Sequence, residues 1–214
     1  MLKPRIAVLV SGGGTNLQAL IDAETSGLLT SGKLAVVVSS KAGAPALERA
    51  KRAGIAYEMV DRAACAGQEA FEARLLETLG RYRADLIVLA GFMHILSANF
   101  VSNYPDRIVN VHPSLIPAYC GKGYYGVKVH EAVLAAGERW TGATVHMVNE
   151  VPDGGRILLQ KRVAVMAGDT PQTLQRRVME QAEWLLLPRA VERLCADMIQ
   201  QDTSRRTHET AGNL

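Results

Sequence analysis

The hydrophobic positions in the first half of the chain form short continuous runs separated by amphipathic stretches. Residues 5–10 (RIAVLV), 34–39 (LAVVVS) and 85–90 (DLIVLA) are apolar and rich in β-branched residues, which is typical of buried strands. Two further short strands are predicted at residues 57–60 and 108–112. Apolar residues at helical spacing predict helices at residues 16–26, 45–53, 69–82 and 98–103. Apolar strands that alternate with helices predict an α/β fold with a parallel sheet covered on both faces.

The second half of the chain has a different pattern. Residues 113–126 are irregular, and residues 127–136 are predicted to be helical. Strands are predicted at 141–148 and 157–165, joined by a Pro-Asp-Gly-Gly turn, and we expect them to pair antiparallel at the sheet edge. Thr170 and Pro171 suit the start of a long closing helix, which Pro188 should kink or interrupt. The prediction is a single-domain, open, mostly parallel twisted sheet over residues 1–201. Residues 202–214 are polar and aperiodic, and they predict a disordered tail.

Composition narrows the class of protein. The 214 residues are 48% hydrophobic and 21% charged, as in an ordinary globular domain. A net charge of +3 does not suggest a nucleic-acid binder. Cys65, Cys120 and Cys195 show no metal-ligand spacing, and an odd number of cysteines indicates no disulfide framework. The first apolar run is too short for a signal segment or a membrane span, so we expect a cytoplasmic protein without a membrane partner.

A glycine-rich loop, SGGGTN at residues 11–16, lies between the first predicted strand and helix. Glycines let the backbone approach a ligand, and the free amides of a helix N-terminus suit a phosphate. The alternative is a tight turn without a ligand. Leu17 stands where the dinucleotide fingerprint needs its third glycine, and no lysine follows as a nucleotide P-loop requires. A phosphate monoester site remains.

Asn110 and His112 alternate on a predicted strand, so they point to the same face at its carboxyl end. An amide donor beside an imidazole can stabilise an oxyanion and move a proton. The alternative is a capping asparagine with a structural histidine. Asp153 lies in the Pro-Asp-Gly-Gly turn and is an ordinary turn residue unless that turn folds back over His112.

With these residues in view, the chain resembles the glycinamide ribonucleotide transformylase family of folate-dependent formyltransferases. The resemblance extends from about Arg5 to Pro188 and rests on motifs in a specific order and spacing. They are SGGGTN (11–16), LAGFM (89–93), ILS (95–97), NVHPSLIP (110–117), TGATVH (141–146) and DGG (153–155). It implies a Rossmann-like formyltransferase fold and formyl transfer from 10-formyltetrahydrofolate, as co-substrate, to the amino group of glycinamide ribonucleotide. It implies no metal, no nucleic-acid partner and a role in purine biosynthesis, and it leaves a homodimer open.

The resemblance also assigns roles to residues. Asn110, a cationic His112 and Asp153 match the catalytic set. The ribonucleotide is expected to contact Gly13, Gly14, Thr15, Asn16 and Glu183. The folate is expected to contact Met93, His94, Ile95, Leu96, Gln68 and Asn149. His94 stands where the family often has arginine, and the basic residue often found near Gln68 is missing.

Other polar residues have less specific interpretations. Lys122 is either a solvated loop residue or a contact for phosphate or the folate tail. His146 is interpreted as structural, His130 as a helix-surface residue and Cys120 as a bystander.

Two rival functions remain open. Formyltetrahydrofolate hydrolase and methionyl-tRNA formyltransferase share the Asn-x-His-Pro-Ser-Leu core, but each carries a further domain for which this chain offers no room. A non-catalytic module that binds a phosphate ligand or folate is the other rival, and it would show no turnover.

Overall fold

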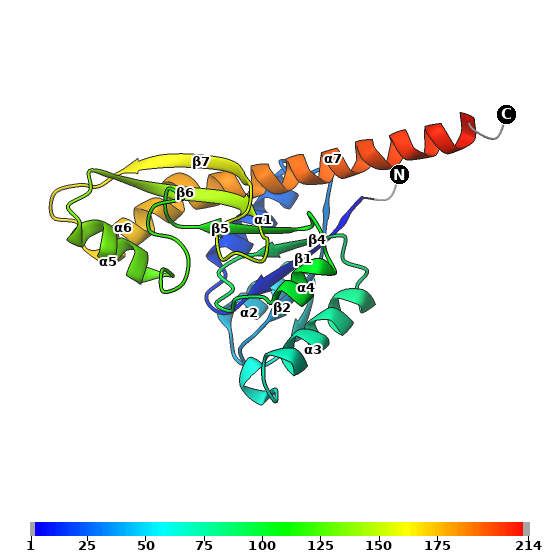
Figure 1. Cartoon of the computed structure of the whole chain (residues 1–214), viewed down its shortest axis with the longest axis horizontal. Helices are drawn as coiled ribbons and strands as arrows, with labels where there is room; N and C mark the ends of the chain where they lie inside the picture. The colour runs from blue at the N-terminus through cyan, green and yellow to red at the C-terminus, as the bar shows by residue number, and fades with distance from the viewer. Residues whose placement is uncertain (1–2, 212–214) are drawn as a thin grey trace.

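The computed structural model describes residues 3–211, with side chains to residue 204. It contains one seven-stranded sheet in the order β3-β2-β1-β4-β5-β6-β7 (Figure 1). The strands are β1 (Arg5–Val10), β2 (Lys33–Ser39), β3 (Ala56–Met59), β4 (Leu86–Leu89), β5 (Ile108–His112), β6 (Trp140–Met147) and β7 (Ile157–Ala164). The helices are α1 (Thr15–Ser26), α2 (Pro45–Arg52), α3 (Gln68–Arg81), α4 (Ala98–Ser102), α5 (Val127–Ala135), α6 (Pro171–Val178) and α7 (Trp184–Ala211), with a 3-10 turn η1 (Arg62–Ala64) and a π-helical turn η2 (Met179–Glu183).

The sheet confirms the predicted mixture of pairings. Strands β1 to β5 pair in parallel, and β6 pairs antiparallel with both β5 and β7. The chain moves outward from β1 through β2 to β3 and then returns to place β4 on the other side of β1. The connections that leave β1 and β4 therefore diverge, which opens a crevice at the carboxyl ends of these two strands.

Two hydrophobic cores flank the sheet because buried strand residues alternate between its faces. Ile6 and Val8 pack with residues of α1, α2 and α7. Ala7 and Leu9 pack with residues of α3 and α4. Figure 1 shows α7 along one face of the sheet and α3 and α4 on the opposite face. This two-sided burial explains why the central strands are apolar without interruption.

The closing helix differs from the prediction at two places. Pro188 lies inside α7, and the irregularity is the preceding π-helical turn η2, which ends at Glu183. A proline ring crowds the carbonyl four residues earlier, here that of Trp184, so the wider turn ends just before the crowded carbonyl.

Helix α7 continues to Ala211, through most of the segment for which the sequence predicts a disordered tail, and the tail stays a prediction. Extending a helix that has already formed needs only one further hydrogen bond per residue, so a polar segment can continue it. Residues 212–214 lie outside the described residues. Within residues 3–211, no helix is both long and apolar enough to cross a membrane.

Candidate active site

A cavity of about 770 Å³ lies at the carboxyl ends of β1, β4 and β5. Its wall combines four chain segments, at residues 12–16, 89–96, 110–113 and 121–126, with parts of the 146–153 segment and of α6 and η2. Every residue that the sequence assigned to the ribonucleotide, the folate or catalysis lines this cavity, with the exception of Gln68. The fold thus brings together groups that are more than 160 residues apart in the chain.

The glycine loop forms one end of the cavity. Gly14 caps α1 in the left-handed conformation, at φ 72°, and no side chain caps the helix. A Cβ atom on Gly14 would lie 2.7 Å from the Cβ of Ala46, so glycine is required both for the turn and for the close approach to α2. The amides of the first turn have no partner within the helix, which is the arrangement that binds a phosphate.

Asn16 and Glu183 join the loop to the π-helical turn. The Nδ2 group of Asn16 donates a hydrogen bond of 2.7 Å to Oε2 of Glu183, while Oδ1 of Asn16 is buried without a partner among the described residues. Burial raises the pKa of Glu183 to about 7, although the hydrogen bond from Asn16 opposes the shift. This carboxyl group therefore titrates near neutral pH at the edge of the cavity.

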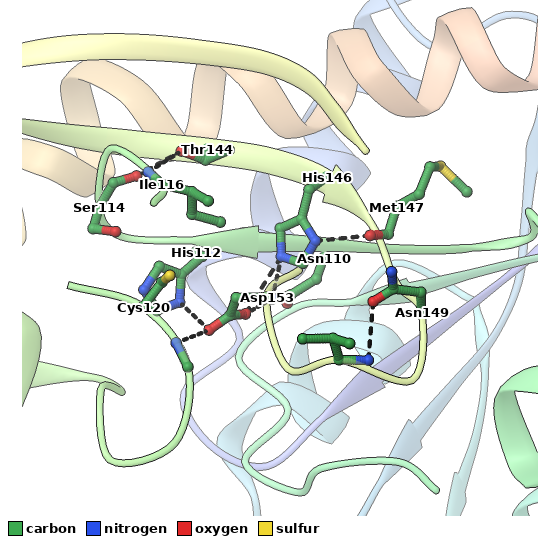
Figure 2. A network of polar contacts seen from close by, with 12 residues as sticks. Asn110, His112, Ser114, Ile116, Cys120, Thr144, His146, Met147, Asn149 and Asp153 are labelled. Carbon is green, nitrogen blue, oxygen red and sulfur yellow. Dashed lines mark hydrogen bonds and ion pairs between the residues drawn. The ribbon is translucent and has the colours of Figure 1, made fainter. Parts of the chain in front are cut away.

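Asn110, His112 and Asp153 meet in the cavity (Figure 2). Nδ1 of His112 lies 3.5 Å from Oδ2 of Asp153, and Nδ2 of Asn110 lies 3.5 Å from Oδ1. The turn that carries Asp153 thus folds back over His112, which is the arrangement under which Asp153 was expected to be more than a turn residue.

The local backbone explains how Asp153 reaches this position. Its φ of 55° is left-handed, a conformation that aspartate tolerates better than most residues. A Cβ on Gly155 would lie 1.8 Å from the carbonyl oxygen of Met147, so this glycine lets the turn pass close to the end of β6. The amide of Gly121 donates a 2.8 Å hydrogen bond to Oδ2 of Asp153, which ties the irregular 118–126 segment to the same carboxylate.

His146 also belongs to this cluster, although the sequence analysis did not place it there. Its Nε2 atom lies 3.2 Å from Nδ2 of Asn110 and 3.4 Å from Oδ1 of Asp153. His146 pairs with Asn110 in the antiparallel register of β5 and β6, so the two side chains share a sheet face. The sequence predicted antiparallel pairing only between the two edge strands, so neither the pairing of β5 with β6 nor the register that aligns these two residues was predicted.

Backbone carbonyls determine which ring nitrogens carry protons. Nδ1 of His146 lies 2.8 Å from the carbonyl oxygen of Met147, and Nε2 of His112 lies 2.9 Å from that of Tyr119. Because a carbonyl only accepts, we assign the protons to these two nitrogens. The remaining nitrogen of each ring therefore faces the Asp153 carboxylate.

The resting charges differ from the expectation of a cationic His112. Burial lowers the pKa of His112 below its usual value, against the opposing effects of Asp153 and the Tyr119 carbonyl, so the ring is largely neutral near pH 7. Burial alone would raise the pKa of Asp153, but His146, His112 and the Gly121 amide together lower it. The cluster at rest therefore places an ionised Asp153 carboxylate beside a largely neutral His112, whose Nδ1 atom can accept a proton.

Another part of the cavity wall is mainly apolar. Residues 93–96 and Asn149 line it, and the amide of Met93 is held by a 2.9 Å hydrogen bond to Oγ of Ser11. The ring of His94 packs edge-on against Phe71 and Phe92, and burial, followed by the charge of Arg62, lowers its pKa.

Gln68 lies outside the cavity wall in the described structure. Its Nε2 group donates hydrogen bonds to Oε1 of Glu72, at 2.9 Å, and to the carbonyl oxygen of Ile95, at 3.2 Å. It therefore supports the segment 93–96 through the Ile95 carbonyl. The geometry therefore disfavours the predicted direct contact between Gln68 and a folate in this cavity.

The remaining flagged residues have mixed outcomes. The prediction that His130 lies on a helix surface is wrong, because the residue is fully buried and neither ring nitrogen has a partner among the described residues. Lys122 lines the cavity, while Sγ of Cys120 donates to the carbonyl of Pro117 at 3.2 Å. Among the described residues, no group of three or more histidine, cysteine, aspartate or glutamate side chains could hold a metal ion.

An open α/β sheet that brings a glycine-rich loop and an amide, imidazole and carboxylate cluster into one cavity at the carboxyl ends of its strands defines the class of α/β proteins that bind small molecules at this place. A family model described as formyl transferase matches residues 4–191. The chain belongs to this family.

Named relatives refine this assignment. The chain is 43% identical over 176 residues to the phosphoribosylglycinamide formyltransferase of Escherichia coli (strain K12), covering 82% of this chain and 80% of that protein. It is 41% identical over 198 residues to the trifunctional purine biosynthetic protein adenosine-3 of Gallus gallus, covering 92% of this chain but only 19% of that protein. The crystal structure of glycinamide ribonucleotide transformylase 1 from Symbiobacterium toebii superimposes with a TM-score of 0.83 at 41% identity, covering 89% of this chain and 86% of that one.

Proposed function

We propose that the protein transfers the formyl group of 10-formyltetrahydrofolate to the amino group of glycinamide ribonucleotide. The observation that carries this proposal is the position of the Asn110, His112 and Asp153 cluster in one cavity whose wall also contains the glycine loop and the segment 93–96. A phosphate-bearing amine bound at the loop and a folate bound at that segment would share this cavity with the cluster.

Two parts of the cavity wall, the glycine loop and the segment 93–96, suit the two substrates. The amides of Gly13, Gly14, Thr15 and Asn16 would bind the ribonucleotide phosphate, and the Glu183 carboxyl group would face its polar portion. The segment 93–96 with Asn149 offers apolar surface and backbone polar groups, which suits a flat pterin. A cytoplasmic location is part of this proposal.

The cluster would stabilise the oxyanion that forms during transfer. The substrate amine attacks the formyl carbon, a new C–N bond forms, and the carbonyl oxygen becomes negatively charged. One N–H of Asn110 is held by His146, while the other is only 3.5 Å from Asp153, at the limit of a hydrogen bond. This loosely held N–H can turn to the oxyanion.

The same cluster would carry the proton. The amine loses a proton after attack, and N10 of the folate needs one when the C–N10 bond breaks. Neutral His112, which faces the Asp153 carboxylate, can accept the first proton, and the neighbouring carboxylate stabilises the resulting imidazolium. Transfer of that proton to N10, directly or through a water, completes the exchange. His146 accepts a hydrogen bond from Asn110 at Nε2 and so holds the amide in place.

The test is the absorbance change that follows loss of the formyl group, measured with both substrates and with each omitted in turn. We expect turnover only when both are present. Deformylation without the ribonucleotide would favour the hydrolase alternative. No reaction in any mixture would contradict the proposal and favour a binding module.

A further inference from the structure

Helix α2 contacts the glycine loop from the side opposite the cavity. The amide of Ala46 donates a 3.1 Å hydrogen bond to the carbonyl oxygen of Gly12. Nε of Arg49 donates a 2.8 Å hydrogen bond to the carbonyl oxygen of Gly13. Two consecutive carbonyls of the loop are therefore turned toward α2.

This contact determines where the loop amides point. In a planar trans peptide, the carbonyl oxygen of one residue and the amide hydrogen of the next point in opposite directions. Because the Gly13 carbonyl is held by Arg49, the amide of Gly14 points away from α2. Both glycines line the cavity. Arg49 thus sets the orientation of a peptide whose N–H group belongs to the candidate phosphate site.

Arg49 is itself held in place. Its Nη1 group donates a 3.0 Å hydrogen bond to Oε1 of Gln18, and Nε2 of Gln18 donates a 2.9 Å hydrogen bond to Oδ1 of Asp22. Arg49 lies outside the main cavity and borders a second, shallower groove against α1. Its guanidinium group therefore acts on the loop from behind.

The charge of Arg49 adds to this effect. A cationic donor on the carbonyl polarises the peptide, which strengthens its N–H group as a donor to an anion on the other side. The positive charge also attracts a phosphate through the loop.

We propose that Arg49 is a positioning residue for substrate phosphate: it orients and polarises the Gly13–Gly14 peptide without touching the substrate. This inference rests on the proposed function for the identity of the substrate, but its geometry concerns any phosphate bound by the loop.

The decisive variant is Arg49→Met, which keeps much of the side-chain length and removes the donors and the charge. We expect the KM for glycinamide ribonucleotide to rise roughly tenfold, because a charge-assisted hydrogen bond is lost. We expect kcat and the KM for the folate to stay within about twofold, because the substitution leaves the catalytic cluster and the segment 93–96 unchanged. Arg49→Lys, which keeps the charge but not the forked donor, should fall between the wild type and Arg49→Met.

Arg52→Met is the matched control, since Arg52 is exposed near the end of the same helix. It removes the same charge and should leave both KM values unchanged. An unchanged KM for the ribonucleotide in folded Arg49→Met protein would overturn the inference. An equal rise in both KM values with a lower Tm would also overturn it, because that pattern indicates a merely structural role.

A measurement with inorganic phosphate separates this inference from the proposed function. Phosphate should slow amide hydrogen exchange at residues 13–16 in the wild-type protein, and this protection should be lost in Arg49→Met and kept in Arg52→Met. Absence of turnover with protection intact would reject only the proposed function. Absence of protection in the wild type, or equal protection in Arg49→Met, would reject the inference.

Discussion

At the scale of single residues, the charge of Asp153 is central to the active site. Asp153 accepts from the Gly121 amide and lies between His112 and His146, so its negative charge organises three separate segments. Neutralising this one side chain changes the electrostatics of the cluster without changing its shape.

Asp153→Asn tests that role. Asparagine adopts the left-handed φ of 55° at least as readily as aspartate, so Tm should stay close to the wild-type value. We expect kcat to fall roughly 10²–10⁴-fold, the usual contribution of acid–base assistance. Asp106→Asn is a matched control, because Asp106 has a φ of 54° and is exposed outside the cavity. Near wild-type turnover in Asp153→Asn would contradict the proton-transfer role.

Glu183 makes a second prediction at the same scale. Burial raises the pKa of this carboxyl group from its ordinary value of 4.5 to about 7 in the folded protein, so between these pH values the folded state holds a proton that the unfolded state releases. This group therefore makes its full contribution to the free energy of unfolding below pH 4.5. That contribution is lost as the pH rises through 7.

Glu183→Gln should remove that dependence. At pH 8 the variant should be more stable than the wild type by on the order of 3 kcal/mol, with little difference near pH 4.5. Urea unfolding across pH 4.5–8 measures the effect. Glu180→Gln, an exposed change in the same turn, should leave the pH dependence as it is. Parallel curves for Glu183→Gln and the wild type would refute the prediction.

At the scale of elements, α5 carries a buried polar residue on its apolar face. His130 is buried beside Val129 and Val133, and burial, followed by the charge of His112, lowers its pKa to about 4. The folded state therefore resists a proton that the unfolded state accepts below pH 6.5. Stability from this group is present above pH 6.5 and is lost as the pH falls toward 4.

His130→Leu should make α5 less sensitive to acid. The variant should gain about 2 kcal/mol relative to the wild type when the pH is lowered from 8 to 5. Unfolding free energies at the two pH values measure this change, and the difference at pH 8 isolates the effect on packing. An equal loss of stability on acidification in both proteins would count against it.

The π-helical turn is the second element with a local consequence. Ala182 and Glu183 are both buried in it, and it delivers Glu183 to Asn16 on α1. The wider turn changes which side chains face inward before α7 begins, and π-helical turns are often found at functional sites. The π-helical turn therefore has two effects: it accommodates Pro188 in the following helix, and it places Glu183 at the cavity.

At the scale of the whole molecule, α7 continues beyond the sheet (Figure 1). Its packing against the core ends at Met198, and residues 200–204 are exposed. The domain boundary near Gln201 stays a prediction that truncation can test.

A chain that ends at Gln201 should keep its stability within about 0.5 kcal/mol, because the described side chains that it loses, at residues 202–204, are exposed. Its kcat/KM should match that of the full chain. Thermal unfolding and the two-substrate assay measure both properties. A chain that ends at Arg193 is the contrasting control, because it loses Cys195 and Leu194 from the core and should unfold at much lower temperature. A large loss of stability on ending at Gln201 would place the boundary further along α7.

The sequence predicted most of the architecture because the deciding signals are local. The apolar run at residues 5–10 and the Thr170-Pro171 helix start match β1 and α6 in the structure. Burial on both sides of a parallel sheet leaves uninterrupted apolar strands, and caps leave short polar motifs. Glycine loop and turn motifs are equally local, so the candidate residues could be named from their order and spacing.

Only the tertiary structure decided how those residues act. The register of β5 against β6 set His146 beside Asn110, and the left-handed turn carried Asp153 onto His112. Burial then made His112 neutral and Glu183 hard to ionise, and it hid His130 inside α5. Contacts between distant segments and the dielectric around a buried group depend on the whole packed chain. Residue types and periodicity do not reveal these contacts or this dielectric. The sequence therefore determined the fold class and the candidate residues, and the tertiary structure decided the partners and charges of those residues.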